Sequence, residues 1–501
     1  MLVKMNSAIV FSLEPTVVEI EILHKNGFPG FEIVGLPDAS VKEAKERVIE
    51  AIKHIGIDFS LRRIVCNLAP ADIKKTGTYL DLPLAVGVLI SSGFINPVIN
   101  LSDTIIVGEL GFNGVIRQLK GVLVIALECV KKGFKNIIFP YSNLDEVSVV
   151  KDVNLYPVKE LSEVIDVIEG RAVPTVYEYN FRPEIESSLD FSEVKGQSFA
   201  KRGLEIAAAG FHNVLMIGSP GVGKSMLAKR LVSIMPPITF EESIETTKIY
   251  SIAKGKINYE GGLVNKRPFR APHHTSSDVS ITGGGTIPSP GEISLAHNGI
   301  LFMDEFPEFK RSVFEVLREP LEERKVTVSR SQGCVTFPAN FLFVAAMNPC
   351  YCGYLWHPVK SCSCTPTKVK QYYKKISGPI LDRIDIHIKM SEIEYEDVNS
   401  KQETSKEIRK RVLKAFNTQM SRQKKYNSML DNNEVNKFCQ IPQKIVPLLR
   451  KLIDKWGISM RNYYKLLKIS RTIADLNGDN DIMEQHILEA VQYRNNFDKY
   501  N

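Results

Sequence analysis

The sequence predicts an α/β protein of several domains, with a parallel β-sheet in its central part. The chain has 501 residues, and single hydrophobic cores stop growing at about 250–300 residues. From about residue 191 to 392, apolar strand-like segments alternate with helical patterns, which is typical of a parallel sheet covered on both faces. From about residue 393 to 501 the pattern is helical and polar, which predicts a small helical domain.

Residues 1–170 predict a separate α/β module. The strand-like segment AIVFSL is followed by the helical pattern ASVKEAKERVIEAIKHIG. Residues 103–140 indicate strand, turn, helix and strand, with Gly133 ending the helix. Residues 171–190 have poor periodicity and contain Pro174 and Pro183, so we expect a linker there.

The composition is that of a soluble globular protein, which we expect to stay in the cytosol. Apolar residues make up 44% and charged residues 24% of the chain, and no run of about 18 apolar residues could span a bilayer. The N-terminal segment carries Glu14 and Glu19, unlike a secretory signal. Eight cysteines in so long a chain do not make a disulfide framework. The net charge of +7 permits a polyanionic partner without requiring one.

A phosphate-binding loop is predicted after the first strand of the central part. Residues 218–225 fit G-x-x-x-x-G-K-[ST] between the apolar strand VLMIG and the amphipathic helix MLAKRLVSIM. In such a loop backbone N–H groups converge on phosphate oxygens, the lysine reaches the β- and γ-phosphates, and the hydroxyl ligates Mg²⁺. We therefore expect ATP and Mg²⁺ as cofactors, bound by Gly218, Ser219, Pro220, Gly221, Val222, Gly223, Lys224 and Ser225.

A second apolar strand, GILFMDE, ends in two carboxylates. Asp304 is expected to hold the Mg²⁺ shell, and Glu305 to polarise the attacking water. A buried strand capped by an acidic turn is the alternative, but the pairing with the phosphate-binding loop favours the catalytic interpretation. The two carboxylates therefore predict hydrolysis of the bound nucleotide.

Two further residues are candidates for completing this site. Asn348 follows the strand NFLFVAAMNP, and a neighbouring strand would deliver it to the γ-phosphate as a sensor of nucleotide state. Arg383 lies between apolar positions in SGPILDRIDIHI, beside Asp382 and Asp385. It is either a local ion pair or an arginine supplied across a subunit boundary to stabilise phosphoryl-transfer charge. We favour the second interpretation, which requires an oligomer.

Together these motifs resemble an AAA+ ATPase of the magnesium-chelatase-like branch. The segment ISMRNYYKLLKISRTIADL, in the predicted C-terminal helices, contributes to the same resemblance. The segment RPFRAPHHTSSDVSITGGGTIPSPGEISLAHNGILFMDEFPEF resembles the YifB/ComM family of bacterial ATPases, and this likeness covers nearly the whole chain. The resemblance implies an AAA+ P-loop NTPase core, a C-terminal helical lid, and Arg461 as a second sensor that contacts phosphate from the lid. It also implies that residues from about 250 to 298 hold an insert that projects toward a central pore.

The N-terminal module resembles the Lon-protease-type (S5-type) fold, in which a Ser/Lys dyad cleaves peptides. In the matching stretch ADIKKTGTYLDLPLAVGVL, Asp81 stands where the protease has its nucleophilic serine. A carboxylate cannot be the activated hydroxyl of such a dyad. We therefore expect a non-proteolytic module with a role in assembly or substrate engagement. Ser91 and Ser92 lie beyond Asp81 and are the alternative if the alignment is displaced.

Four cysteines follow the predicted sensor strand closely: Cys350, Cys352, Cys362 and Cys364. Two close pairs joined by a short connector could place four thiolates around one tetrahedral Zn²⁺, with His357 as a substitute ligand. The C-x-C spacing is tighter than the usual one, so four reduced thiols in a surface loop are the alternative. Because the loop follows Asn348, we expect a structural metal rather than a catalytic one.

Basic residues cluster in three segments, each of which alone is more typical of a solvated face. In relatives of this branch, the hairpin ERKVTVSRSQGCVTF, with Arg324, Lys325 and Arg330, faces the pore of a ring. Residues 406–425 predict a basic helix. The stretch TKVKQYYKKIS suits phosphate contact and base stacking, and its residues are Lys368, Lys370, Lys374 and Lys375 around Tyr372 and Tyr373. Together the three segments favour a DNA partner.

Adjacent histidines, His273 and His274, occur in RAPHHTSS. Neighbouring side chains point in different directions on a helix or a strand, so the two make a poor chelating pair. We interpret them as loop contacts or as groups that support the site, with a small role near nucleotide or substrate left open.

The leading hypothesis is a cytosolic, Mg²⁺-dependent AAA+ ATPase that works as a ring, expected to be a hexamer, because Arg383 needs a neighbouring subunit. As the family resemblance implies, it would drive DNA translocation and branch migration during natural transformation or recombination. A chaperone for metal insertion, like the ATPase subunit of magnesium chelatase, is the first alternative. An ATP-dependent protease would need a serine in place of Asp81. A regulatory protein that uses ATP as a switch would not need Glu305.

Overall fold

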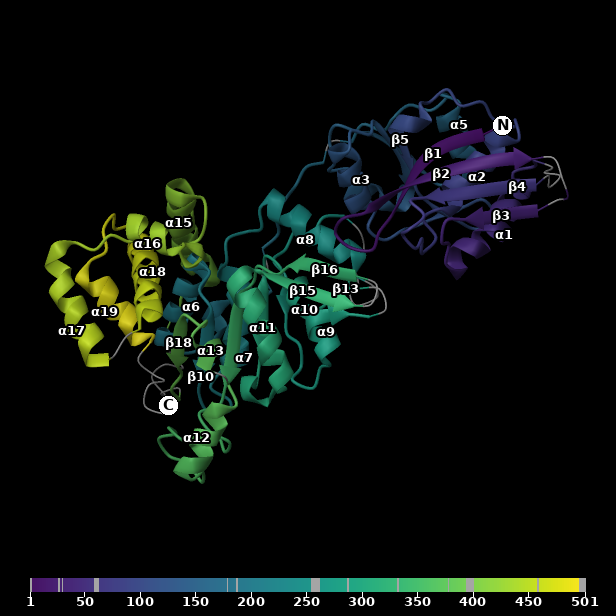
Figure 1. Ribbon diagram of the computed structural model, residues 1–501. Helices are drawn as coiled ribbons and strands as arrows, with labels where there is room; N and C mark the ends of the chain where they lie inside the picture. The colour runs from purple at the N-terminus through teal and green to yellow at the C-terminus, as the bar shows by residue number, and fades with distance from the viewer. Residues whose placement is uncertain are drawn as a thin grey trace. The chain divides into compact units, whose positions relative to one another are not determined.

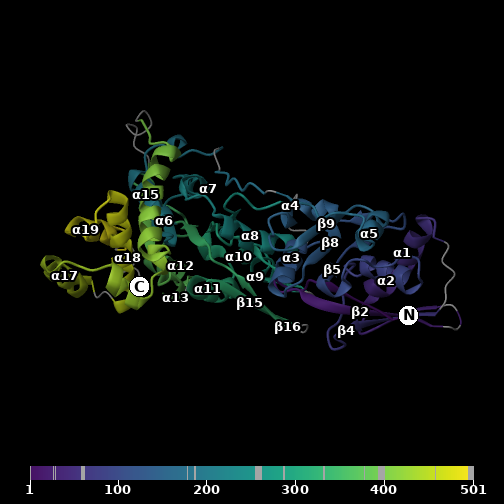
Figure 2. The same cartoon turned by 90° about the horizontal axis from the view of Figure 1, so that it is seen from above.

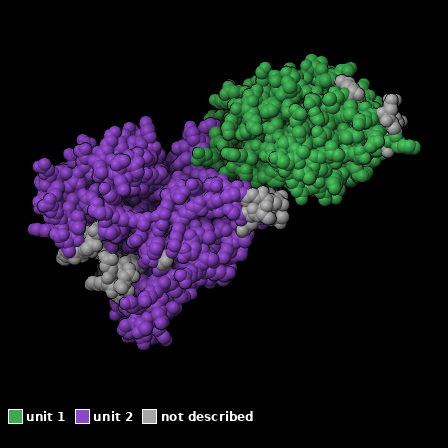
Figure 3. All heavy atoms as spheres, in the orientation of Figure 1, with its two compact units in different colours: residues 1–182, 243–264, 286–289 green, residues 183–242, 265–285, 290–501 purple. Residues whose placement is uncertain are grey.

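The computed structural model describes residues 2–25, 28, 30–57, 63–177, 179–185, 188–253, 262–285, 288–330, 333–376, 378–392, 401–456 and 459–494. The chain forms two compact units (Figure 3). The first unit comprises residues 1–182, 243–264 and 286–289, and the second comprises residues 183–242, 265–285 and 290–501. Within the described ranges, no helix combines the length and the apolar character that crossing a membrane requires.

The first unit is built on a seven-stranded mixed sheet in the order β3-β4-β2-β1-β5-β8-β9. Strand β1 pairs antiparallel with β2 and parallel with β5, and β2 pairs antiparallel with β4. The outer pairs β3/β4, β5/β8 and β8/β9 are parallel. The strands are β1 (Leu2–Ile9), β2 (Thr16–Lys25), β3 (Gly30–Val34), β4 (Arg63–Ala69), β5 (Thr104–Ile106), β8 (Asn136–Pro140) and β9 (Asn154–Val158), and a short hairpin adds β6 (Glu109–Leu110) and β7 (Ile116–Arg117).

The helices of this unit follow from local sequence signals. Asp38 caps the first helix by accepting a hydrogen bond from the backbone N–H of Val41 at 2.9 Å. Gly133, with φ of +79°, follows the end of α3 in the left-handed conformation that favours glycine. The predicted α/β module is therefore confirmed, whereas its likeness to the Lon-type fold stays a prediction. The helices are α1 (Ala39–His54), α2 (Asp81–Ser91), α3 (Val122–Lys131), α4 (Leu144–Val147) and α5 (Leu161–Ile168).

The second unit contains a five-stranded sheet in the order β11-β14-β17-β10-β18, and every pair in it is parallel. The predicted parallel sheet is confirmed. Because β17 lies between β10 and β14, the residues that follow these three strands meet at one edge of the sheet. The strands are β10 (Val214–Ile217), β11 (Phe269–Arg270), β14 (Ile300–Met303), β17 (Leu342–Met347) and β18 (Ile386–Lys389).

Part of the segment that we expected to be an insert belongs to this sheet. Strand β11 lies within residues 250–298 and pairs with β14. Residues 254–261 of the segment lie outside the described part of the chain. Residues 265–285 and 290–298 of this segment therefore belong to the second unit, whereas residues 250–253, 262–264, 288 and 289 belong to the first. The segment also contributes β12 (Gly283–Gly284), β13 (Ser289–Pro290), α9 (Asp278–Thr282) and α10 (Glu292–Leu295).

Other helices and a hairpin complete the core of the second unit. The hairpin follows α11 directly, and its two strands pair antiparallel with one another, as the sequence predicts. The elements are α6 (Ser198–Gly210), α7 (Lys224–Ile234), α11 (Arg311–Glu323), β15 (Lys325–Arg330), β16 (Gly333–Pro338), α12 (Pro366–Lys374) and α13 (Gly378–Leu381). Helix α8 (Phe240–Ile252) begins in the second unit, and its residues from 243 onward belong to the first unit.

The C-terminal part of the second unit is helical, which confirms the prediction. Figures 1 and 2 show α15 running beside α6 and α18. Thr404 and Glu407 form a capping box that starts α15. The hydrophobic core is continuous from the sheet into these helices, and includes Val344, Leu204 and Ile473. The helices are α15 (Ser405–Gln423), α16 (Asn432–Phe438), α17 (Val446–Trp456), α18 (Met460–Asn477) and α19 (Glu484–Gln492).

Candidate nucleotide site

The predicted phosphate-binding loop connects buried strand β10 to helix α7. Gly221 and Gly223 have φ of +88° and +94°, a conformation that strains residues with a side chain. At Gly218 an added Cβ would lie 2.9 Å from Cβ of Met390, so this position also requires glycine. Helix α7 begins at Lys224, which points the first backbone N–H groups of the helix at the loop. This is the geometry that binds phosphate.

Lys224 contacts both the loop and the predicted sensor residue. Its Nζ donates to the carbonyl oxygens of Gly218 at 2.6 Å and Ser219 at 2.8 Å, and to Oδ1 of Asn348 at 3.1 Å. Burial lowers the pKa of Lys224, and the carboxylate of Asp304 opposes this shift. The strand order therefore brings the predicted lysine and asparagine into direct contact.

Ser225 and Asp304 are also in contact. The Ser225 hydroxyl donates to a carboxylate oxygen of Asp304 at 2.5 Å. Both groups are hard oxygen ligands of the kind Mg²⁺ prefers. A cation at this position would contact the two oxygens that the sequence assigns to it, so the residues present fit an Mg²⁺ ion.

Glu305 is the most exposed member of the group. Its side chain is 58% exposed, and its backbone is left-handed, with φ of +50°. Oε2 of Glu305 lies 3.3 Å from Nδ1 of His274, and the rings of His273 and His274 lie 4.2 Å apart. The sequence analysis left a role for His274 open but did not identify its partner. The signal in the sequence is the pair His273 and His274, which follows β11 closely. It could have indicated a contact with Glu305 only if β11 had been recognised as a strand beside β14.

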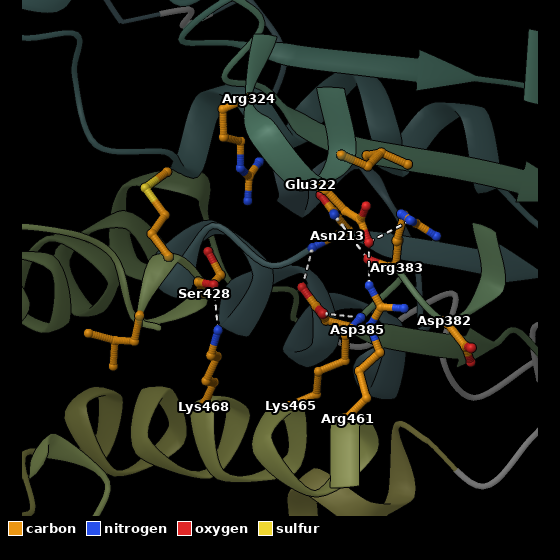
Figure 4. Close-up of a pocket in the computed structure, with 13 residues that line it drawn as sticks. Asn213, Glu322, Arg324, Asp382, Arg383, Asp385, Ser428, Arg461, Lys465 and Lys468 are labelled. Atoms are coloured by element: carbon orange, nitrogen blue, oxygen red, sulfur yellow. Dashed lines mark hydrogen bonds and ion pairs between the residues drawn. The ribbon is translucent and has the colours of Figure 1, made fainter. Parts of the chain in front are cut away.

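The two predicted arginines lie in a different part of the second unit. Arg383 and Arg461 both form ion pairs with Oε1 of Glu322, the first at 2.5 Å (Figure 4). The hydrogen bond from Arg383 lowers the pKa of Glu322. These residues line a cavity of about 330 Å³, and none of the described residues around it belongs to the phosphate-binding loop. Within one subunit, the arginines therefore form a group separate from Lys224.

Asp382 and Asp385, the carboxylates next to Arg383 in the sequence, are not the ion-pair partners of Arg383 described above. Asp385 pairs with Lys465 at 2.8 Å and lies 3.6 Å from His212. Asp382 lines the same cavity. The ion pair of Arg383 is thus made with Glu322, a residue that the sequence analysis did not single out. Glu322 lies near the end of α11, and the sequence carries no signal that would bring it to Arg383.

The four clustered cysteines come together as the sequence predicts. Sγ of Cys350 lies 3.3 Å from Sγ of Cys352 and 3.6 Å from that of Cys362. All four sulfur atoms, with that of Cys364, lie within 4.8 Å of one another. His357 instead lies 3.8 Å from Glu392. The arrangement can hold one tetrahedral metal ion through sulfur alone.

The basic hairpin is less available to a partner than the sequence predicts. Arg324 turns inward, where it donates to the carbonyl oxygen of Phe341 at 3.0 Å, and burial lowers its pKa. Arg324 is half-buried and lines the cavity that also contains Arg383 and Arg461, and a pore-facing role for the hairpin stays a prediction. Lys325 pairs with Glu323 at 2.7 Å. The side chain of Arg330 lies outside the described part of the structure.

In the two other basic segments, some of the side chains are buried or held in ion pairs within the protein. Tyr372 and Tyr373 of α12 are buried, so the prediction that they stack on bases is wrong. The four lysines of this segment are exposed. In α15, Arg411 pairs with Glu205 and Glu403, and Arg422 pairs with Asp475. These last two arginines stabilise the packing of the helix.

Asp81 has a structural partner in the first unit. Its two carboxylate oxygens accept hydrogen bonds from Arg47 at 2.7 and 3.0 Å, and its side chain is 1% exposed. Ser91 is buried, and its hydroxyl donates to the carbonyl oxygen of Val88 at 3.1 Å. The hydroxyl of Ser92 is buried. Asp81 begins α2, whereas Ser91 and Ser92 lie at the end of this helix. Neither serine therefore takes the place of Asp81.

The arrangement of a phosphate-binding loop, an acidic strand and a polar residue on the strand between them defines an ATPase of the AAA+ class. Three models of the magnesium chelatase family match this chain. They are magnesium chelatase, subunit ChlI, at residues 190–398; subunit ChlI of Mg-chelatase, at residues 18–143; and magnesium chelatase, subunit ChlI C-terminal, at residues 402–494.

Two relatives align with nearly the whole chain. Competence protein ComM of Haemophilus influenzae is 40% identical over 98% of both chains. The uncharacterized protein YifB of Salmonella typhimurium is 39% identical over 98% of this chain and 96% of its own. More distantly, DNA replication licensing factor mcm6 of Dictyostelium discoideum is 21% identical over 58% of this chain and 31% of its own. The chain belongs to the ComM/YifB family of magnesium chelatase-like AAA+ ATPases.

Proposed function

We propose that this protein is a cytosolic, ring-forming ATPase that couples ATP hydrolysis to movement on DNA, as a helicase that drives branch migration in natural transformation or recombination. The observation that carries the proposal is the separation of two groups in one subunit. Lys224, Ser225, Asp304 and Asn348 converge at one edge of the sheet, whereas Arg383 and Arg461 meet on Glu322. A ring would bring the second group of one subunit to the first group of the next.

The residues at the sheet edge have distinct proposed roles. The backbone N–H groups of the loop would hold the phosphates of ATP, and Lys224 would exchange its carbonyl partners for the β- and γ-phosphates. Ser225 and Asp304 would hold Mg²⁺, which neutralises the developing negative charge when bound. Glu305 would take a proton from the attacking water, and Asn348 would contact the γ-phosphate.

The two arginines would act from the neighbouring subunit. Each already faces a carboxylate, so each would exchange Glu322 for phosphate oxygens when subunits meet. Because Arg461 shares Glu322 with Arg383, we propose that both arginines reach the same nucleotide. Six subunits are the proposed ring size.

The names of two relatives support DNA as the partner. One is a competence protein and another is a DNA replication licensing factor. The exposed lysines of α12 could contact phosphates without reading sequence: Lys368, Lys370 and Lys374. Lys375, which follows α12, is exposed as well and pairs with Glu308 at 2.9 Å. The first unit, with Asp81 paired to Arg47, would serve assembly or substrate engagement rather than proteolysis.

Remodelling of a protein partner for metal insertion is the second candidate function. The three family models carry the name of a magnesium chelatase subunit, and the structure leaves fewer basic side chains available than the sequence predicts. We further propose Zn²⁺ as a structural cofactor beside ATP and Mg²⁺, held by the four clustered cysteines.

Strand separation by the purified protein tests the DNA motor. A labelled four-way or forked DNA is incubated with ATP and either the wild type or Glu305→Gln, which should bind ATP without hydrolysing it. Separation by the wild type and none by the variant is the expected result. ATP turnover that neither responds to DNA nor moves a strand would overturn the DNA motor and favour the protein-remodelling candidate.

A further inference from the structure

The cysteine cluster lies in a segment with few other means of holding its shape. Residues 351–364 contain neither helix nor strand, and Gly353 is the only one of them that is buried. Ordering the backbone costs about 1–2 kcal/mol per residue, which apolar burial normally offsets. This segment buries too little to offset that cost, so another interaction must order it. A metal bound by residues from both ends would supply one.

The sulfur positions suit zinc. Four thiolates at the usual Zn–S distance of about 2.3 Å stand about 3.8 Å from one another in a tetrahedron. The three sulfur pairs among Cys350, Cys352 and Cys362 lie 3.3, 3.5 and 3.6 Å apart. The backbone N–H of Cys364 donates to Sγ of Cys362 at 3.4 Å, an outer contact of the kind that orients a ligand. Soft sulfur donors without carboxylates select zinc over Mg²⁺.

The same segment touches the phosphate-binding loop. Gly353 has φ of +83°, and a Cβ added there would lie 2.6 Å from Cδ of Pro220. The backbone of Gly353 therefore rests directly on the ring of a residue in the loop. Further along the connector, Lys389 at the end of β18 lies over the ring of Trp356, 4.5 Å from its centroid.

The segment also follows the sensor residue. Cys350, the most buried of the four ligands, is two residues after Asn348, and Asn348 accepts the hydrogen bond from Lys224. An ion at the cysteines would thus restrain two sides of the nucleotide site. One is the end of β17, and the other is Pro220.

We propose that Zn²⁺ held by Cys350, Cys352, Cys362 and Cys364 supports the phosphate-binding loop through Gly353 and Pro220, so that zinc occupancy sets the affinity for ATP. This inference rests on the proposed role of residues 218–225 in binding ATP. Zinc and ATP then bind with positive coupling, which is reciprocal and commonly amounts to roughly 5–150-fold.

The first test measures zinc content and ATP affinity on the full chain. Metal analysis of the purified protein should find one zinc per chain, and Cys352→Ser and Cys362→Ser should lose it. Cys334→Ser is the matched control, because Cys334 is an exposed thiol outside the cluster. Titration with a fluorescent ATP analogue should show about tenfold weaker binding for the zinc-free variants and for wild type treated with a chelator.

Gly353→Ala tests the contact with the phosphate-binding loop without removing a zinc ligand. A methyl group at this position would meet Pro220, while the four ligands remain. We expect this variant to keep its zinc and to bind the ATP analogue more weakly, with an unchanged circular dichroism spectrum. Because this variant keeps all its ligands, it answers the question even if the cysteine variants fold poorly.

Two results would overturn the inference. One is protein that holds no zinc as purified and takes up none from a zinc solution. The other is zinc that can be removed by the chelator while ATP affinity stays the same. Neither result depends on DNA, so the zinc inference and the proposed DNA motor can fail separately.

Discussion

Nδ1 of His274 lies 3.3 Å from a carboxylate oxygen of Glu305, the residue proposed to activate water. The two come from loops that follow neighbouring strands, β11 and β14. Glu305 is otherwise largely exposed, so His274 is the group that orients it. We therefore propose that His274 positions Glu305 for hydrolysis.

His274→Ala should lower kcat for ATP hydrolysis by about tenfold, a fraction of the 10²–10⁴-fold that a general base contributes. ATP affinity should stay nearly the same, because among the described residues His274 contacts Glu305 and the ring of His273 rather than the phosphate-binding loop. His273→Ala is the control and should leave kcat unchanged. An unchanged or increased kcat in His274→Ala would contradict the positioning role.

Mixing two inactive variants should restore ATP hydrolysis. Lys224→Ala removes the phosphate contact and Arg383→Ala removes the proposed finger, so each variant alone should be inactive. In a mixed ring, some interfaces would pair an intact Lys224 with an intact Arg383. Steady-state ATP turnover at increasing ratios of the two variants measures this recovery.

A mixture that stays inactive, although the two variants form rings together, would mean that Arg383 acts within its own subunit. Lys229→Ala serves as the control for Lys224→Ala, because Lys229 lies on the same helix and is exposed. It should hydrolyse ATP at the wild-type rate.

Asp81→Ala should destabilise the first unit by about 3–5 kcal/mol, the usual cost of leaving one partner of a buried ion pair unpaired. The reason is that Arg47 would keep its charge with the bidentate carboxylate removed. Chemical denaturation followed by circular dichroism measures the change. Glu21→Ala breaks an exposed pair with Lys4 and should have a much smaller effect. An equally small effect of Asp81→Ala would show that the pair is not structural.

The unfolding free energy of the second unit should decrease as the pH falls below about 6.5. Burial lowers the pKa of His212, and it lowers that of His387 well below the usual range. The unfolded chain therefore takes up protons near pH 6.5 that the folded chain does not, which favours unfolding at lower pH. Each histidine contributes a slope of at most about 1.4 kcal/mol per pH unit.

Denaturation at pH 7, 6 and 5 measures this slope. His387→Leu should reduce it, whereas His273→Gln, which changes an exposed histidine, should not. If His387→Leu unfolds with the same pH dependence as the wild type, His387 does not control stability in this range.

Much of the nucleotide site could be predicted because its signals are local. The pattern of residues 218–225 requires a strand before it and a helix after it, and both are present. Asp304 and Asn348 each follow a buried strand, so parallel pairing alone brings them to the same edge. The cysteine cluster was predicted for the same reason, since close spacing brings its members together.

The partners of charged residues could not be predicted. Glu322 is far from Arg383 and Arg461 in the sequence, and nothing in its neighbours indicates that it joins them. The burial of Tyr372 also reversed a prediction made from composition. A side chain's charge or ring is visible in the sequence, but its exposure depends on what packs over it.

The sequence by itself determined the α/β class, the phosphate-binding loop, the acidic strand and the helical C-terminal region, because periodicity and turn residues act over a few positions. Only the tertiary structure decided that His274 faces Glu305, that two arginines share Glu322, and that Gly353 rests on Pro220. These contacts join segments far apart in the chain, and they depend on strand order and packing rather than on local preference.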